Sequence, residues 1–428
     1  MNGYTKLIPS LIYLLLFIGT GLVPNYGALD KIATQWLYLS IINTIGLIHF
    51  LYKGNTKNIL ENFLKFKPFI FLLLFVIWGV LSFFYSTNST EVLVKFVRWA
   101  QLPISLYILT SIYYDFQYNH VNLLNTISLI ISIVLIIELY YSYSPYFQIV
   151  EYTKYNFSFA NIIKGATANK NITAASILIK TPFLIYLIYN IKNTIIQFLL
   201  FTINFSAFYM VFLLSARATI IAFFLILLVL VLLFTIKIIK QKSYLKNSSI
   251  WLIIASFILS ASLFQLNFRD DNTASFTKRV STINTEDTSS QQRIRFYKHS
   301  IDQIISNPII GVGLGNWKIK SIDYDKNDVE GYIIPYHTHN DFLEIGAELG
   351  LVGLLLYLLI FYFPLKNLFK NYSKEFINSS TLILFSGIVY FVDSNLNFPH
   401  ARPVMQIPFM LILIISFIQK NNKKDDRV

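Results

Sequence analysis

The chain has 428 residues, of which 55% are hydrophobic and only 13% are charged. Soluble domains carry about 25% charged residues, so this composition excludes an ordinary soluble protein and indicates a protein of the membrane. The net charge of +13 does not indicate nucleic-acid binding, because most lysines and arginines lie in short loops beside hydrophobic runs. The chain has no cysteine, which excludes disulfides and a cysteine nucleophile.

Apolar runs of about 17 to 25 residues recur along nearly the whole sequence, and each can cross a bilayer as a helix. We predict an all-α integral membrane protein with about twelve transmembrane helices, forming a single polytopic domain over residues 1–428. The expected spans lie near residues 7–24, 32–52, 68–86, 92–112, 121–142, 171–190, 194–214, 218–236, 249–266, 341–363, 377–395 and 403–419.

The basic residues gather in every second connection between the expected spans. Lysine and arginine are enriched in cytoplasmic loops, so this alternation predicts that both ends of the chain are cytoplasmic. The residues concerned are Lys53, Lys57, Lys65, Lys67, Lys237, Lys240, Lys242, Lys246, Lys366, Lys370 and Lys374, and the basic tail at 420–428.

Two connections are longer than the others, at about residues 143–170 and 267–340, and both fall on the non-cytoplasmic side. The second begins with a polar stretch over 269–292. It continues with a candidate amphipathic helix over 293–305 and a glycine-rich turn over 311–317. Because binding and catalytic residues concentrate in loops on a rigid scaffold, we expect the site here, in the 267–340 loop between the ninth and tenth spans.

Three residues beside expected helix ends on this side have side chains suited to chemistry, namely Arg217, Arg293 and His339. A guanidinium binds phosphate oxygens with a planar fork and keeps its charge. A neutral imidazole can take a proton from a hydroxyl group. Each residue alone also has a structural interpretation, because an arginine at a helix end can be an interfacial anchor and a loop histidine can be a cap.

Weaker candidates surround this set. They are Arg295, His337, Asn340, Arg402 and Arg98, and Lys95 lies near the last of them. The pattern His337-Thr338-His339 with Asp341 also resembles a zinc site. Neither H-x-H nor H-x-H-x-D is specific, however, and the further candidate ligand, His400, is distant in sequence. We expect no metal and no cofactor.

The order of motifs is similar to the O-antigen ligase and polymerase superfamily. The stretches that carry the resemblance are ANKNITAASILIKTPFLIYLI, SARATIIAFF, QRIRFYKHSIDQIISNPIIGVGLGNW and HTHNDFLEIGAELGLVGLLLYL, within about residues 160–420. Three motifs are specific only in combination, namely the R-x-x-x-(W/Y) pattern of the expected amphipathic helix, the N-P-x-x-G-x-G-x-N turn and the H-N-x-x-L-x-x-x-x-E-x-G segment.

The resemblance implies a GT-C-type enzyme of the bacterial inner membrane whose active site faces the periplasm. It implies that a glycan moves from undecaprenyl pyrophosphate to lipid A-core or a glycan acceptor, with inversion and without a metal. Arg217 and Arg293 match the pyrophosphate-binding arginines and His339 matches the catalytic histidine. Tyr297 stands where tryptophan is usual, and a slip of two residues would exchange Arg293 with Arg295. The NFPHARP segment resembles the ending of many bacterial members, which favours a place for Arg402 in the site.

Several functions stay open at this point. The shared motifs fit ligation of a finished glycan, polymerisation of repeat units and protein O-glycosylation. A transporter of twelve spans is an alternative from another class, because Glu138 and Lys180 lie inside expected spans.

Overall fold

The structure is a computed structural model of the chain that describes residues 7–30, 32–53, 56–116, 119–167, 169–268, 288–328, 336–370 and 376–425. Every regular element in these ranges is helical, which confirms the predicted all-α class. The α-helices are α1 (Ile8–Gly19), α2 (Ala33–Tyr52), α3 (Thr56–Lys65), α4 (Lys67–Leu81), α5 (Ser89–Asp115), α6 (His120–Tyr152), α7 (Lys170–Asn190), α8 (Thr194–Leu214), α9 (Arg217–Lys240), α10 (Ser248–Asn267), α12 (Thr288–Ser306), α13 (Trp317–Asp325), α14 (Asp341–Lys370), α15 (Ser379–Leu396) and α16 (Pro403–Asp425).

Ten of the described helices are long and apolar enough to cross a membrane. The two other expected spans correspond to α1 and α2. The helix α1 continues into a short 3-10 turn and reaches only Leu22, and α2 carries polar residues that lower its hydropathy. One of these, Asn43, is buried and bonded to Gln101 and Ser105 of α5, so α2 is held by polar contacts within the protein. The chain is a multispan membrane protein.

Two helices differ from the expected boundaries. The helix α6 runs on to Tyr152, so part of the connection expected at 143–170 is helical. The helix α14 is kinked at Gly350, where φ is +65° and a Cβ atom would lie 2.2 Å from the carbonyl oxygen of Ile309. Beyond the kink, the amide of Leu351 donates to the carbonyl of Pro308 at 2.7 Å. Only glycine allows the turn that follows α12 to dock on α14 in this way.

The expected amphipathic helix and glycine-rich turn are both present, as α12 and the turn before α13. The turn rests on α14, because the amide of Gly313 donates to the carbonyl of Glu348 at 2.8 Å. Gly311 has φ +66°, and a Cβ there would lie 2.4 Å from that same carbonyl oxygen. The turn therefore fixes α12 and α13 against the start of α14. The polar stretch expected before α12 lies, over residues 269–287, outside the described residues.

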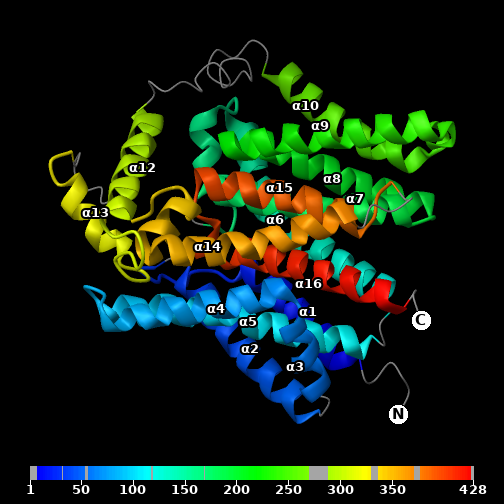
Figure 1. Cartoon of the computed structure of the whole chain (residues 1–428). Coiled ribbons are helices and arrows are strands. Elements are labelled where there is room, and N and C mark those ends of the chain that lie inside the picture. The colour runs from blue at the N-terminus through cyan, green and yellow to red at the C-terminus, as the bar shows by residue number, and fades with distance from the viewer. Residues whose placement is uncertain are drawn as a thin grey trace.

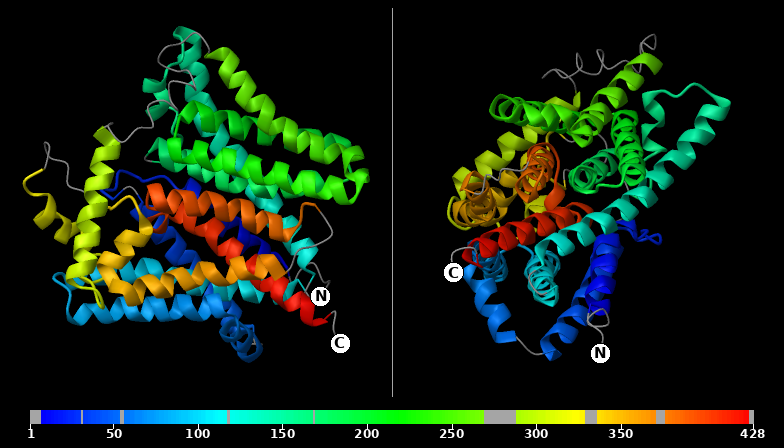
Figure 2. Two further views of the ribbon diagram at one scale, coloured as in Figure 1. Left: turned by 45° about the horizontal axis from the view of Figure 1, so that its top comes forward. Right: turned by 90° about the vertical axis from the view of Figure 1, so that its right-hand side faces the viewer.

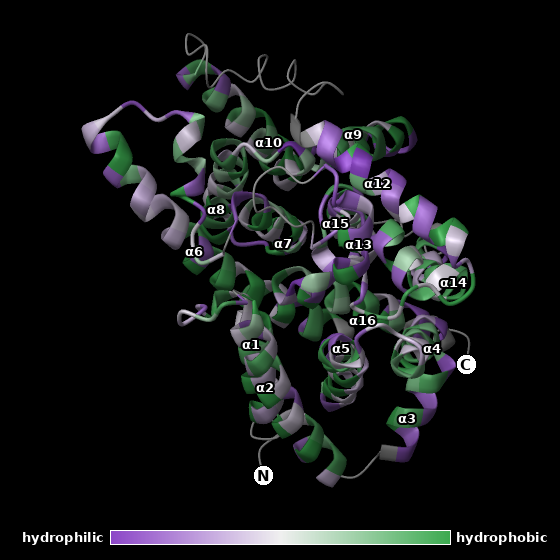
Figure 3. Ribbon diagram, turned by 90° about the vertical axis from the view of Figure 1, so that its left-hand side faces the viewer, coloured by the Kyte–Doolittle hydropathy of each residue, from purple (hydrophilic) through white to green (hydrophobic). Residues whose placement is uncertain are grey.

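The long helices run side by side, and α12 lies across one end of the bundle with α13 beside it (Figure 1; Figure 2, left). The helices α9, α14 and α16 begin at this end, and α5 begins there as well, since Asn88 bonds to Asn316 in the glycine-rich turn. At the opposite end, Lys67, Lys366 and Lys420 line one small cavity, and Lys420 donates to the carbonyl of Lys65 at the end of α3. Seen from the α12 end, hydrophilic residues gather on α12 and near α13, whereas the flanks of the long helices are largely hydrophobic (Figure 3).

The helix α7 is the most enclosed of the ten spans, with 94% of its apolar window buried. Its Lys180 lies 2.6 Å from Glu138 of α6, and Ser176 donates to the same carboxylate at 2.6 Å. The two charges that favoured a transporter thus neutralise each other inside the protein. A buried charge is tolerated when it is paired and hydrogen-bonded in this way.

Candidate active site

His339 occupies the last turn of chain before α14. Asn340 caps that helix, because its side chain accepts hydrogen bonds from the amides of Phe342 at 3.0 Å and Leu343 at 3.1 Å. The backbone of His339 has φ +61°, one of three positive values among the described non-glycine residues. This conformation costs roughly 1 to 2 kcal/mol for a residue with a side chain, so neighbouring contacts must hold it.

Those contacts come from three helices. The amide of Thr338 donates to Glu344 of α14 at 3.1 Å, and its hydroxyl lies 3.1 Å from that of Ser300 in α12. The Tyr297 hydroxyl of α12 lies 3.1 Å from the carbonyl oxygen of His339 and 2.9 Å from that of Asn395 in α15. The tyrosine that replaces the usual tryptophan therefore ties the histidine loop to α15 by its hydroxyl group.

Phe398, in the corner between α15 and α16, contacts three side chains of the candidate site. The His337 ring stacks on it at 4.0 Å between centroids, and the Arg402 guanidinium lies 3.8 Å from the ring centre. The His339 ring meets it edge-on at 5.2 Å. The NFPHARP segment therefore lies beside His337 and His339.

His339 is a neutral base. Burial, together with the positive charges of Arg293 and Arg402, lowers its pKa to about 4. Its Nδ1 atom is buried and has no hydrogen-bond partner among the described residues. With this pKa the imidazole is uncharged at neutral pH, so one ring nitrogen carries a lone pair that can accept a hydrogen bond or a proton from a hydroxyl group.

Two cations accompany His339. Arg402 is 2% exposed, and burial lowers its pKa to about 10, so it stays charged at neutral pH. Its Nη1 atom has no hydrogen-bond partner within the part of the chain that the structure describes. Arg293 acts on the His339 pKa from α12, whereas Arg295 forms an ion pair with Asp325 of α13 at 2.8 Å. This geometry favours Arg293 over Arg295 as the arginine of the site.

Arg217 is half-buried and is the first residue of α9. It follows Ser215, whose backbone is left-handed with φ +54°. The helix begins at the end of the bundle that carries α12 (Figure 1). Arg217, at the start of α9, and His339, just before α14, thus lie at the same end of the molecule.

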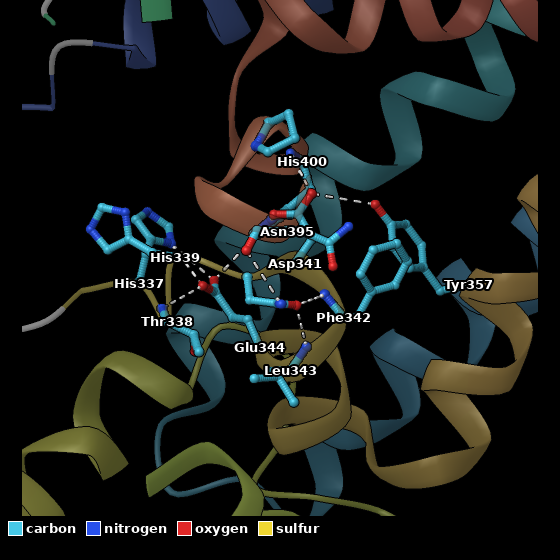
Figure 4. Close-up of polar contacts among 12 residues, drawn as sticks. His337, Thr338, His339, Asp341, Phe342, Leu343, Glu344, Tyr357, Asn395 and His400 are labelled. Carbon is cyan, nitrogen blue, oxygen red and sulfur yellow. Dashed lines mark hydrogen bonds and ion pairs between the residues drawn. The ribbon is translucent and has the colours of Figure 1, made fainter. Parts of the chain in front are cut away.

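A second group of titratable side chains lies beside His339 and is centred on Glu344 (Figure 4). His337 Nδ1 lies 2.9 Å and His400 Nε2 lies 3.3 Å from the Glu344 carboxylate. Burial opposes protonation of His400, but the adjacent Asp341 carboxylate, 2.6 Å away, outweighs it and raises the His400 pKa to about 9. Burial lowers the pKa of His337, although Glu344 opposes this.

This group revises the metal interpretation of the H-x-H pattern. The ligand atoms of His337, Glu344 and His400 lie within 4.8 Å of one another and can hold a metal ion, as can His299, Asp325 and Asp328. His339 belongs to neither set. His400, which is distant in sequence, is brought in by the corner between α15 and α16.

Two cavities reach the site from different sides. One of about 560 Å³ has several charged groups in its lining, which includes Asp30, Lys95, Arg98, Trp99, His337 and Glu344. In it, Arg98 is paired with Asp30 at 2.6 Å, which gives the weak candidate Arg98 a structural role. The other, of about 550 Å³, is a wholly apolar groove between α9, α14, α15 and α16 that extends from Leu365 to Phe342, three residues from His339.

Sequence reasoning missed Glu344 and Phe398, and it gave Lys95 only as a weaker candidate. A signal was present for Glu344, because Asp341, Glu344 and Glu348 are carboxylates within an otherwise apolar expected span, where ionisable groups indicate function. No signal in the sequence joins Lys95, some 300 residues away, to His400.

Comparison with known proteins supports the resemblance to the O-antigen ligase superfamily. A family model described as O-antigen ligase matches residues 202–358, a range that contains Arg217, Arg293 and His339. The teichuronic acid biosynthesis protein TuaE of Bacillus subtilis is 23% identical over 379 residues, which cover 85% of this chain and 74% of that protein.

Proteins provisionally named polysaccharide ligases are similar too. That of Rickettsia prowazekii is 24% identical over 372 residues, 81% of this chain and 84% of its own length. That of Rickettsia conorii is 36% identical over 92 residues, a match that spans 21% of this chain and only 22% of the relative. These matches confirm the resemblance that the motifs predict: the chain is related to the O-antigen ligase superfamily, with the family's domain at residues 202–358.

Proposed function

We propose that this protein is an inverting, metal-independent glycosyltransferase that moves a glycan from undecaprenyl pyrophosphate to an acceptor hydroxyl group. The observation that carries the proposal is the His339 side chain. It is neutral, its Nδ1 lacks a partner among the described residues, and the positive charges of Arg293 and Arg402 act on it. A base beside fixed cations suits a reaction in which a hydroxyl loses a proton and a pyrophosphate leaves.

The donor would enter from the membrane. The apolar groove suits an isoprenoid tail, because it lies between spans and ends at Phe342 close to the histidine loop. Arg217 and Arg293 would hold the pyrophosphate by charge-assisted hydrogen bonds, and Arg402 would add a third positive charge.

Transfer would follow in one displacement. The acceptor oxygen bonds to C1 of the donor sugar while the bond from C1 to the phosphate oxygen breaks, which inverts the anomeric centre. His339 takes the hydroxyl proton, and the departing undecaprenyl pyrophosphate keeps the bonding electron pair and is stabilised by the arginines. The phosphoanhydride-linked donor is already a good leaving group, so no cofactor is required.

The orientation follows from the two ends of the bundle. Lys67, Lys366 and Lys420 line one small cavity at the end opposite α12, and basic residues favour the cytoplasmic side. The protein would then lie in the inner membrane of a bacterium with both termini in the cytoplasm and with His339 facing the periplasm.

Ligation of a finished glycan, as in O-antigen transfer to lipid A-core, is the first candidate, since several relatives are named polysaccharide ligases. Polymerisation of repeat units uses the same kind of donor and is the alternative, and protein O-glycosylation differs only in its acceptor. Polysaccharide transport is disfavoured by the closed Glu138–Lys180 pair, whose charges satisfy each other.

A glycan profile tests the proposal. The gene is deleted in its host, and free lipid-linked glycan and cell-surface polysaccharide are separated, with the wild-type gene and His339→Ala as complements. Long chains that accumulate on the carrier indicate a ligase, and acceptors bearing a single repeat unit indicate a polymerase. Unchanged glycans in the deletion strain, or full complementation by His339→Ala, would contradict the proposal.

A further inference from the structure

The cluster around Glu344 has the design of a metal site. Glu344 is 1% exposed, and its carboxylate receives His337 Nδ1 at 2.9 Å and His400 Nε2 at 3.3 Å. Tetrahedral zinc ligands lie about 2.0 to 2.2 Å from the ion and therefore about 3.4 Å from one another. The two pairs of atoms are already near that spacing, and two histidines with a glutamate form a common ligand set for zinc.

The outer contacts fit the same design. His400 Nδ1 lies 2.6 Å from the fully buried Asp341 carboxylate, which turns Nε2 toward Glu344. Histidines that bind metals almost always donate their other ring N–H to such a carboxylate. Trp99 stacks against the His400 ring at 6.0 Å and an interplanar angle of 7°, so the ring cannot turn freely.

A cation of the protein lies in this cluster. Lys95 reaches in from α5, and its Nζ lies 3.2 Å from His400 Nε2 and 3.5 Å from Glu344 Oε1. The Lys95 side chain is only 13% exposed, so its ammonium group is enclosed with these atoms. The ammonium group fills space that an ion bound to these two atoms would need, so the lysine and a divalent ion exclude each other.

We propose that the Lys95 ammonium group takes the place of a divalent metal ion in the His337–Glu344–His400 site. The lysine joins α5 to Glu344 at the start of α14 and to His400 in the corner at 397–402, and Glu344 in turn bonds to His337, so these segments are connected as a structural zinc would connect them. This inference does not depend on the proposed transferase function. It predicts that the site becomes a zinc site when Lys95 is removed.

The test uses the full-length protein purified in detergent. Every variant carries His299→Gln, which removes the second group of potential ligands. Lys95→Ala should lower the apparent melting temperature, and zinc at about 50 µM should raise it again by at least about 4 °C, with reversal by a chelator. The same zinc should shift the Lys95-containing parent by less than about 1 °C.

Matched controls locate the effect. Lys318→Ala removes another lysine that lines the same cavity and should gain no response to zinc. Lys95→Ala combined with His400→Gln keeps the space but loses a ligand, and it should not respond either. Lys95→Met, which retains most of the side-chain volume, replaces Lys95→Ala if that variant aggregates. Recovery of monodisperse protein from cells grown with zinc is then an additional measurement.

Three results would overturn the proposal. The first is an equal zinc response in the parent, which would mean that Lys95 does not occupy the site. The second is a folded Lys95 variant that does not respond to zinc. The third is a failure of both Lys95 variants to yield monodisperse protein even with zinc, since zinc should replace the missing cation.

Discussion

His337 and His339 are two residues apart and both contact Phe398, yet their other surroundings differ. His337 is bonded to Glu344 and stacked on Phe398. His339 has a strained backbone and a buried Nδ1 without a partner among the described residues. Strain and unsatisfied polar atoms persist only where surrounding structure enforces them, and they are typical of functional sites. This contrast supports the proposal that the first histidine holds the loop in place and that the second acts on the substrate.

Replacing the two histidines in turn should separate these roles. His339→Ala should lower glycan transfer at least about 100-fold, the contribution expected of a general base, with little change in melting temperature. His337→Ala should lower the melting temperature and reduce transfer less. Transfer is measured by the glycan profile of the complemented deletion strain, and stability is measured on purified protein. The reverse pattern would refute the assignment.

The two arginines of α12 offer a similar contrast. Arg293→Lys should lower transfer by about 100-fold or more, because one ammonium group cannot replace the guanidinium fork at a pyrophosphate. Arg295→Lys should retain most of the transfer, since a lysine can still pair with Asp325. Equal losses in both variants would leave no distinction between them. A greater loss for Arg295→Lys would shift the matched motif by two residues.

Glu344 is the residue that bonds to His337 and to the amide of Thr338, and so it should stabilise the histidine loop. Glu344→Gln should destabilise the protein by about 1 to 3 kcal/mol, because the partners of the carboxylate remain buried without it. Transfer at low temperature should fall less than in His339→Ala. The free energy of unfolding in denaturant, or the melting temperature where unfolding is irreversible, measures the effect. An unchanged stability would show that the cluster does not hold the loop.

Stability should also depend on pH in two opposite ways. His400 has a folded-state pKa of about 9 against an ordinary value of 6.5, so its contribution is complete below pH 6.5 and is lost as pH rises through about 9. His339 has a folded-state pKa of about 4, so stability falls as pH decreases from 6.5 toward 4. The melting temperature should therefore decline on both sides of neutrality. His400→Gln should flatten only the alkaline decline, and His339→Gln only the acidic one.

The sequence predicts the class of the fold because apolar runs of membrane length need no tertiary information to be recognised. It also points to Arg217, Arg293 and His339 in one loop-bearing region. It does not reveal that Phe398 meets the His339 ring, since this residue approaches through the corner after α15. Nor does it reveal the contact of Lys95 with His400, because distant helices meet only through packing.

The role of His339 is tested most directly by measuring binding of the lipid carrier and transfer of the glycan in the same variants. Purified wild type, His339→Ala and Arg293→Ala are each incubated with undecaprenyl pyrophosphate in nanodiscs, and bound lipid is measured by native mass spectrometry alongside transfer in complemented cells. We predict that His339→Ala binds the lipid as wild type does but transfers no glycan, whereas Arg293→Ala loses both. Normal transfer by His339→Ala would contradict the account.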